Sequence, residues 1–303
     1  MSFKLFIYYC ALCGAWAALV VWVQVIAVGL HEEQAEQSRL LLNSALTGAA
    51  LGLQLGLVVG ILDALLNSVG YQRVLRPLVC AAVGMGGGLF GALVGEAGYQ
   101  YLSLPKFLGW MLVGTAIGVS VGVFDLFRAL AVRRGTGLAL RKTVNGLIGG
   151  LIGGLVGGML FALLTSPSFL SLVPMPRGSL ALGLVILGSS IGLLIGTAQV
   201  VLKEAWVRVE AGFRPGRELI LSKAETTIGR AEDCDIGLFG DSGIERLHAR
   251  IVLEGNRYLL ADAGTPGGTF LNGERITGPT PLRSGDRIGM GKAILRFGER
   301  QKR

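Results

Sequence analysis

Two aspartates, Asp63 and Asp125, are notable because each closes a long run of apolar residues and glycines. A carboxylate inside a membrane is a functional candidate by default, for example on a path for ions or protons. Both residues, however, lie at the end of their run, where a carboxylate reaches water or a nearby arginine. The arginines within reach are Arg73, Arg76, Arg128 and Arg133. We therefore favour a structural role for both aspartates over an ion site, and we interpret Glu96 in the same way.

Other reactive side chains are few. Cys10 and Cys13 form a C-x-x-C pattern, but no second cysteine pair or histidine stands at a metal-binding distance along the chain, so small packing residues are the better interpretation. His31 stands alone. No Ser/His/Asp set or pair of catalytic carboxylates is recognisable, so we expect neither an enzyme nor a bound metal or cofactor.

The stretch GLIGGLIGGLVGG, residues 146–158, has glycine at more than half of its positions. A phosphate-binding loop would place Lys and Ser or Thr after its glycines, and a flexible linker would mix glycine with serine. Neither pattern is present. In lipid an unpaired peptide group is costly, so the stretch should be helical, with glycines that let a neighbouring backbone approach closely.

Composition separates two regions. The chain of 303 residues is 51% hydrophobic and 16% charged, against about 25% charged in a usual soluble domain. Residues 212–303 nevertheless hold 15 of the 28 basic and 12 of the 20 acidic residues. The rest of the chain contains six runs long enough to cross a bilayer. These predicted spans cover residues 5–30, 40–63, 77–97, 107–127, 143–164 and 179–202, within a transmembrane region of residues 1–202.

The basic residues predict an orientation, because short cytoplasmic loops accumulate Lys and Arg. With the N-terminus inside, ten cations fall in inner loops and three, Arg39, Lys106 and Arg177, in outer loops. The ten are Lys4, Arg73, Arg76, Arg128, Arg133, Arg134, Arg141, Lys142, Lys203 and Arg208. We therefore expect an integral, multi-pass membrane protein whose N- and C-termini are cytoplasmic, with anionic lipids as neighbours.

Glycines also reveal a repeat of two-helix hairpins. The set Gly52, Gly56, Gly60 and Asp63 recurs 62 residues later as Gly114, Gly118, Gly122 and Asp125. Five further glycines, from Gly84 to Gly95, recur at the same offset. A partial third copy follows after 74 more residues as Gly188, Gly192, Gly196 and Gln199. Such hairpins can be related by an axis along the membrane normal.

The C-terminal region predicts an all-β sandwich, because short alternating runs such as RELILS, HARIVLEG and KAILRF are separated by turn residues. We assign residues 203–216 to a connector that is helical at first, 217–298 to the β domain, and 299–303 to a basic tail. Positive charge in this domain is not interleaved with aromatic residues, so we do not expect nucleic acid as a partner.

The segments TTIGRAEDCDIGL, IERLHARI, LLADAGTPGGTFLNGERI and PLRSGDRIGMG resemble, in order and spacing, the forkhead-associated (FHA) domain family, which reads phosphothreonine peptides. The resemblance covers residues 217–298. It implies phosphopeptide-binding positions at Arg230, Glu245, Arg246, Thr265 and Gly267. It implies framework roles for Gly229, His248, Gly268, Thr269 and Asn272.

Two of these positions depart from the family pattern. Glu245 stands where the family has a serine, and a carboxylate repels a phosphate that carries a charge of about −1.5 to −2. Gly267 stands where the family has an asparagine, and Pro266 removes the hydroxyl before it. Glu245 would also be able to pair with Arg230 or Arg246 as a built-in substitute for the phosphate.

Three functions therefore remain open. We favour a membrane-anchored FHA protein that recruits a protein partner, with or without phosphothreonine, to the cytoplasmic membrane face. One alternative is a transporter or channel built from the glycine-rich hairpins, with a regulatory FHA domain. The other is a structural component of a homo-oligomer with a phosphate-independent β domain, in which a bulky residue at Gly150 would separate the packed helices.

Overall fold

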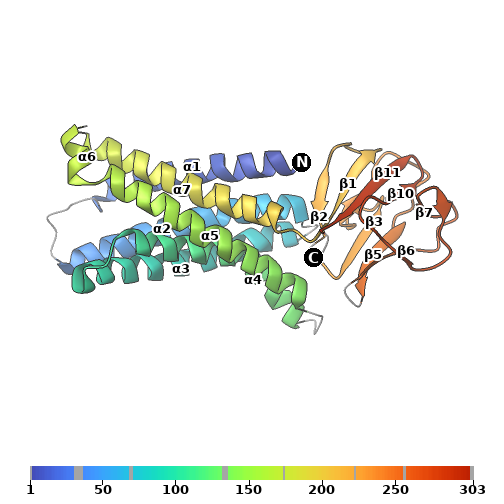
Figure 1. Ribbon diagram of the computed structural model, residues 1–303, viewed down its shortest axis with the longest axis horizontal. Helices are drawn as coiled ribbons and strands as arrows, with labels where there is room; N and C mark the ends of the chain where they lie inside the picture. The colour runs from blue at the N-terminus through green and yellow to red at the C-terminus, as the bar shows by residue number, and fades with distance from the viewer. Residues whose placement is uncertain are drawn as a thin grey trace. The chain divides into compact units, whose positions relative to one another are not determined.

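The computed structural model describes residues 2–30, 37–67, 71–131, 136–172, 175–221, 223–254 and 257–300. It divides the chain into two compact units, a helical bundle and a C-terminal sandwich (Figure 1). His31, Arg133 and Arg134, together with residues 301–303 of the predicted basic tail, lie outside the described residues.

Seven helices form in the described part of the bundle, and six of them are long and apolar enough to cross a membrane. The six correspond to the six predicted runs, because uninterrupted apolarity over some 20 residues favours a helix of that length. Their bounds, with that of the short helix α6 in the Pro-rich loop, are α1 Phe3–Val28, α2 Gln37–Asn67, α3 Gln72–Leu102, α4 Phe107–Ala131, α5 Gly137–Leu164, α6 Pro167–Leu172 and α7 Pro176–Val201.

Glycines bring the helices of each predicted hairpin into backbone contact. A Cβ atom at Gly52 of α2 would lie 2.0 Å from the carbonyl oxygen of Gly84 in α3. A Cβ atom at Gly118 of α4 would lie equally close to the carbonyl oxygen of Gly146 in α5. The glycine-rich stretch is therefore helical, and its glycines are needed for close packing. Gly150 also packs within the chain, against Gly114, so the bulk of a substitution there would act on this bundle first.

The third copy of the repeat pairs with the beginning of the chain. A Cβ atom at Gly188 of α7 would lie 2.5 Å from the carbonyl oxygen of Gly14 in α1. A Cβ atom at Gly192 would lie 2.2 Å from the carbonyl oxygen of Cys10. Helix α7 thus has α1 as its partner, and the bundle consists of three similar helix pairs: α2 with α3, α4 with α5, and α7 with α1 (Figure 1). Cys10 serves as a small buried packing residue in the third pair.

Apolar side chains fill the interior of the bundle at repeat-related positions of α2, α4 and α7. Nine of them belong to one buried cluster and are at most 1% exposed. In groups that follow the 62- and 74-residue offsets they are Leu51, Val113 and Leu187; Leu55, Ile117 and Ile191; and Val59, Val121 and Ile195. The repeat seen in the glycines therefore extends to the core, and burial of these side chains stabilises the bundle.

The C-terminal unit is the predicted all-β sandwich of two sheets around one apolar core. One sheet has the strand order β2-β1-β11-β10-β7-β8, and the other has the order β4-β3-β5-β6-β9. Pairing is antiparallel except between β3 and β4. The strands are β1 Ala205–Ala211, β2 Glu218–Ile220, β3 Glu225–Gly229, β4 Ile236–Gly237, β5 Ala249–Glu254, β6 Arg257–Asp262, β7 Phe270–Leu271, β8 Glu274–Arg275, β9 Thr280–Pro281, β10 Arg287–Met290 and β11 Ala293–Glu299.

The prediction that the connector at residues 203–216 begins as a helix was wrong. Residues 205–211 form strand β1, which lies between β2 and β11 in its sheet. Ala205, Val207 and Val209 point into the core and alternate with less buried residues, which is the two-residue period of a strand. Pairing of Val207 with Phe297 of β11 decides the conformation, because tertiary contacts override weak helix propensity.

Candidate functional site

Three loops of the sandwich meet beside the end of strand β3. They connect β3 to β4, β4 to β5, and β6 to β7. The backbone N–H of Arg230 donates to the carbonyl of Glu245 at 2.9 Å, and that of Ala231 donates to the carbonyl of Arg246 at 3.0 Å. A Cβ atom at Gly229 would lie 2.2 Å from the Arg246 carbonyl oxygen, so this close approach requires glycine. The first two loops are therefore held side by side.

His248 connects the second loop to the third. Its ring is fully buried, and its Nδ1 accepts a hydrogen bond from the backbone N–H of Glu245 at 3.1 Å. The other ring nitrogen, Nε2, lies 3.2 Å from the carbonyl oxygen of Gly268. Because Nδ1 accepts, the proton belongs on Nε2, which then donates to Gly268. Gly268 has φ +71°, which favours glycine, and this aims its carbonyl at the histidine.

Asp262, at the end of β6, organises the third loop and was missed by the sequence prediction. Its carboxylate accepts hydrogen bonds from the hydroxyls of Thr265 at 2.8 Å and Thr269 at 2.6 Å, and from the backbone N–H groups of Gly264 and Thr265. Burial opposes the charged form, but these hydrogen bonds together hold the pKa of Asp262 below its ordinary value. The signal was an aspartate at a strand end followed by Gly and Thr, a pattern typical of an Asx turn.

Arg230 and Arg246 are exposed, whereas Glu245, which precedes Arg246 on the second loop, is partly buried. The built-in pair of Glu245 with either arginine does not form, and neither arginine takes part in an ion pair in the described part of the chain. Both guanidinium groups therefore remain free to bind an anion. A guanidinium group suits phosphate because its planar set of N–H donors can bind two oxygens at once.

The third loop contributes Pro266 and Gly267, both exposed. A Cβ atom at Gly267 would lie 3.4 Å from the carbonyl oxygen of Gly243 and meet nothing closer, so an asparagine fits there without strain. Arg275 of β8 donates to the carbonyl of Pro266 at 3.2 Å. The loop therefore stays in place without a side chain at position 267.

A family model described as "FHA domain" matches residues 226–291, which include all three loops. The C-terminal sandwich is an FHA domain. Within it Thr269 is fully buried and bonds to Asp262, as described above. Asn272 of the FHA domain has φ +53° and connects the β7–β8 turn to β10, since its side chain donates to Asp286 and accepts from the backbone of Arg287.

Known proteins resemble the chain over the same region. The glycogen accumulation regulator GarA of Mycobacterium tuberculosis is 35% identical over 106 residues, or 35% of this chain and 60% of GarA. The oxoglutarate dehydrogenase inhibitor of Corynebacterium jeikeium is 34% identical over 106 residues and is covered to 67%. The chain thus spans about 60% of the length of relatives such as GarA. A solved structure from work on phosphothreonine-dependent FHA domain interactions is 27% identical, with a TM-score of 0.30, and is covered completely by 33% of this chain.

Outside the FHA domain, the structure brings the two predicted intramembrane carboxylates together. Asp63 accepts hydrogen bonds from Arg76 at 2.5 Å and from Lys142 at 2.7 Å. Asp125 binds the same two cations, Arg76 directly and Lys142 at 2.9 Å. Of the two expected environments, water or a nearby arginine, the structure shows the arginine: Arg76 binds both carboxylates, and Asp63 is only 3% exposed. Sequence reasoning included Arg76 among the partners of the aspartates but placed Lys142 in a loop.

The buried group of Asp63, Arg76, Asp125 and Lys142 is electrically balanced, with two carboxylates and two cations. In the third repeat Gln199 replaces the aspartate, and its side chain donates to the backbone carbonyl of Lys142 at 3.1 Å. A neutral amide is sufficient there because the two cations already match the two aspartates. The arrangement is that of a structural ion-pair network, in which the buried Nε of Arg76 has no hydrogen-bond partner among the described residues.

Proposed function

We propose that this protein is an integral membrane protein whose FHA domain binds a phosphothreonine-containing protein partner at the cytoplasmic membrane face. The observation that carries the proposal is the pair of exposed arginines, Arg230 and Arg246, on two loops held together by backbone hydrogen bonds. Free guanidinium groups on a fixed loop pair are suited to an oxygen-rich anion on a peptide. The role is one of binding rather than catalysis.

The departures from the family pattern predict weak binding. Glu245 places a negative charge beside the arginines and cannot donate a hydrogen bond to phosphate. Gly267 lacks the amide that would hold the peptide backbone. We therefore expect selective but low-affinity recognition, in which a partner is retained mainly when its concentration at the membrane is high.

The membrane location in this proposal is supported by the six apolar helices and by the distribution of Lys and Arg, which favours cytoplasmic termini. The apolar core of the bundle and its balanced ion network provide no observation in favour of a transporter or channel. Gly150, considered for contacts between copies, packs inside the chain. We therefore propose a helical anchor as the role of the bundle.

The test is fluorescence anisotropy of the full chain in detergent with labelled phosphothreonine peptide pools and their unphosphorylated counterparts. We expect binding only to phosphorylated peptides, and a loss of about tenfold or more in Arg230→Ala, since a hydrogen bond to a charged group contributes about 1.5–3 kcal/mol. Glu245→Ser with Gly267→Asn should tighten binding about thirtyfold, from two new hydrogen bonds of about 1 kcal/mol each.

Arg257→Ala is the matched control, because Arg257 is exposed at the other end of β6 from the three loops. It should leave binding unchanged. Equal binding of phosphorylated and unphosphorylated peptides would contradict the proposal, and so would an Arg230→Ala chain that binds like the original. Membrane location is tested separately by alkaline extraction of cell membranes, in which an integral protein stays in the pellet.

A further inference from the structure

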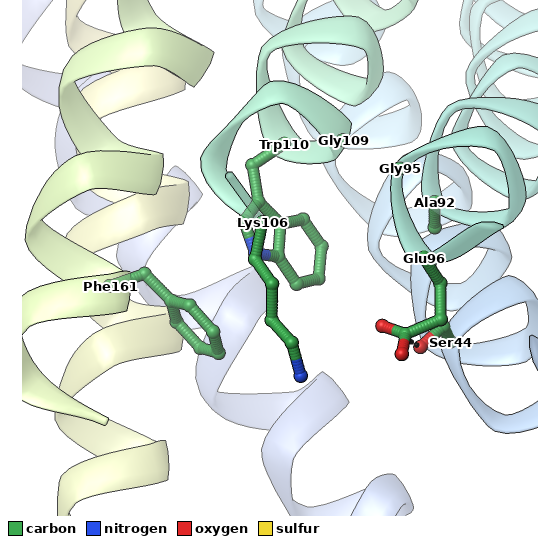
Figure 2. Close-up of a pocket in the computed structure, with 8 residues that line it drawn as sticks. All are labelled: Ser44, Ala92, Gly95, Glu96, Lys106, Gly109, Trp110 and Phe161. Atoms are coloured by element: carbon green, nitrogen blue, oxygen red, sulfur yellow. Dashed lines mark hydrogen bonds between the residues drawn. The ribbon is translucent and has the colours of Figure 1, made fainter. Parts of the chain in front are cut away.

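A pocket of about 180 Å³ lies in the helical bundle, in the half of the spans that the charge distribution places at the outer side. Four helices and one loop line it: α2 contributes Ser44, α3 Glu96, the α3–α4 loop Lys106, α4 Trp110 and α5 Phe161 (Figure 2). The repeat-related position to Glu96, 62 residues later, is Gly158. The acidic group is therefore a specific feature of this pocket rather than part of the repeat.

Two opposite charges line the pocket without pairing. The Glu96 carboxylate accepts hydrogen bonds from the Ser44 hydroxyl at 3.2 Å and from the Gln100 side chain at 3.1 Å. The Lys106 ammonium lies over the ring of Tyr99, 4.4 Å from its centre. Figure 2 shows the Lys106 ammonium and the Glu96 carboxylate among the side chains that line the pocket. No ion pair joins them in the described part of the chain, and Lys106 is exposed, so both charges are available to a bound molecule.

The rest of the lining limits what can enter. Trp110 and Phe161 pack edge to face, with ring centres 5.2 Å apart, and form an apolar wall. The pocket is smaller than the roughly 300–1,000 Å³ of sites that hold drug-sized ligands. A small molecule with an N–H donor at one end and an anionic group at the other complements this lining.

We propose that the pocket binds a small zwitterion, with its ammonium group at Glu96 and its anionic group at Lys106. This chemistry has two sources, the headgroup of phosphatidylethanolamine and a free molecule such as glycine or phosphoethanolamine. The lipid source rests on the proposed membrane location, whereas the free source does not. The site is independent of the FHA domain and its loops.

The experiment uses the purified full chain in detergent. Native mass spectrometry measures retention of added phosphatidylethanolamine and phosphatidylcholine, and equilibrium dialysis measures binding of labelled phosphoethanolamine and glycine. Glu96→Gln and Lys106→Gln keep the side-chain size but remove one charge each. Arg39→Gln removes an exposed charge on the same predicted side without touching the pocket, and serves as the control.

We expect at least one of these zwitterions to bind, and each pocket variant to weaken it about tenfold or more, while Arg39→Gln has no effect. The original chain should also prefer phosphatidylethanolamine to phosphatidylcholine if the lipid is the source, since the three methyl groups of choline remove the N–H donors. Binding of phosphoethanolamine or glycine alone would assign the free source. Binding that is the same in the original and both pocket variants, or no binding of any probe, would overturn the proposal.

Discussion

The buried ion network predicts how the bundle responds to loss of one charge. Lys142 is 7% exposed and donates to both Asp63 and Asp125. In Lys142→Gln this four-residue group keeps one cation, Arg76, for its two aspartates. Removal of one partner from a buried ionic group typically costs about 3–5 kcal/mol, because a charge is left uncompensated away from water. At about 2–4 °C per kcal/mol, the unfolding midpoint should fall by about 10 °C.

A second change restores the charge balance. In Lys142→Gln with Asp125→Asn, Asp63 keeps its 2.5 Å hydrogen bond to Arg76 and the group is neutral again. The double variant should therefore be more stable than Lys142→Gln, although it has one ionic group fewer. The assay is thermal unfolding of the full chain in detergent, followed by tryptophan fluorescence. If the double variant unfolds at or below the midpoint of the single variant, charge balance does not hold this network together.

Three further outcomes are expected. Gly229→Ala should destabilise the FHA domain and weaken peptide binding together, because its methyl group would push the Arg246 carbonyl away; binding lost at unchanged stability would contradict this. Because the pKa of Asp262 is lower in the folded than in the unfolded state, its carboxylate stabilises the domain at pH values above about 4, the unfolded pKa, and this contribution is lost as pH falls through the folded pKa. Asp262→Asn should therefore make the free energy of unfolding, measured in urea, depend less on pH in the acid range. An unchanged pH profile would contradict this. Gly118→Leu should disrupt the α4–α5 pair through contact with Gly146, and a chain that remains folded in detergent with an unshifted midpoint would refute this packing argument.

Sequence alone predicted the elements whose cause is local or periodic. Apolar runs predicted the six long helices, and alternation with turn residues predicted the sandwich. The glycine repeat predicted close helix pairs, which Gly52 and Gly118 form with Gly84 and Gly146. Strand β1 was missed because its alternating pattern is short and its conformation depends on pairing with β11, which lies some 90 residues later.

The site was less predictable because its contacts join distant segments. The resemblance supplied Arg230 and Arg246, but not whether Glu245 forms an ion pair with them, and the side-chain positions show that it does not in the described part of the chain. Similarly, Lys142 was predicted to lie in a loop because of its charge. In the structure it lies on a helix, one turn before Gly146, and contacts two aspartates on other helices, which hydropathy alone does not show. The pairing of α1 with α7 was also not predicted, because it too joins segments that lie far apart in the sequence.

That pairing of α1 with α7 imposes an order on biosynthesis. Helix α1 is translated before α2 to α6, whereas its partner α7 is translated after them, so the face of α1 that carries Cys10 and Gly14 gains its contacts only once α7 has been made. The α2–α3 and α4–α5 pairs are complete before it. Because the FHA domain follows α7 along the chain, every nascent chain that has reached the FHA domain also contains the helix that closes the third pair.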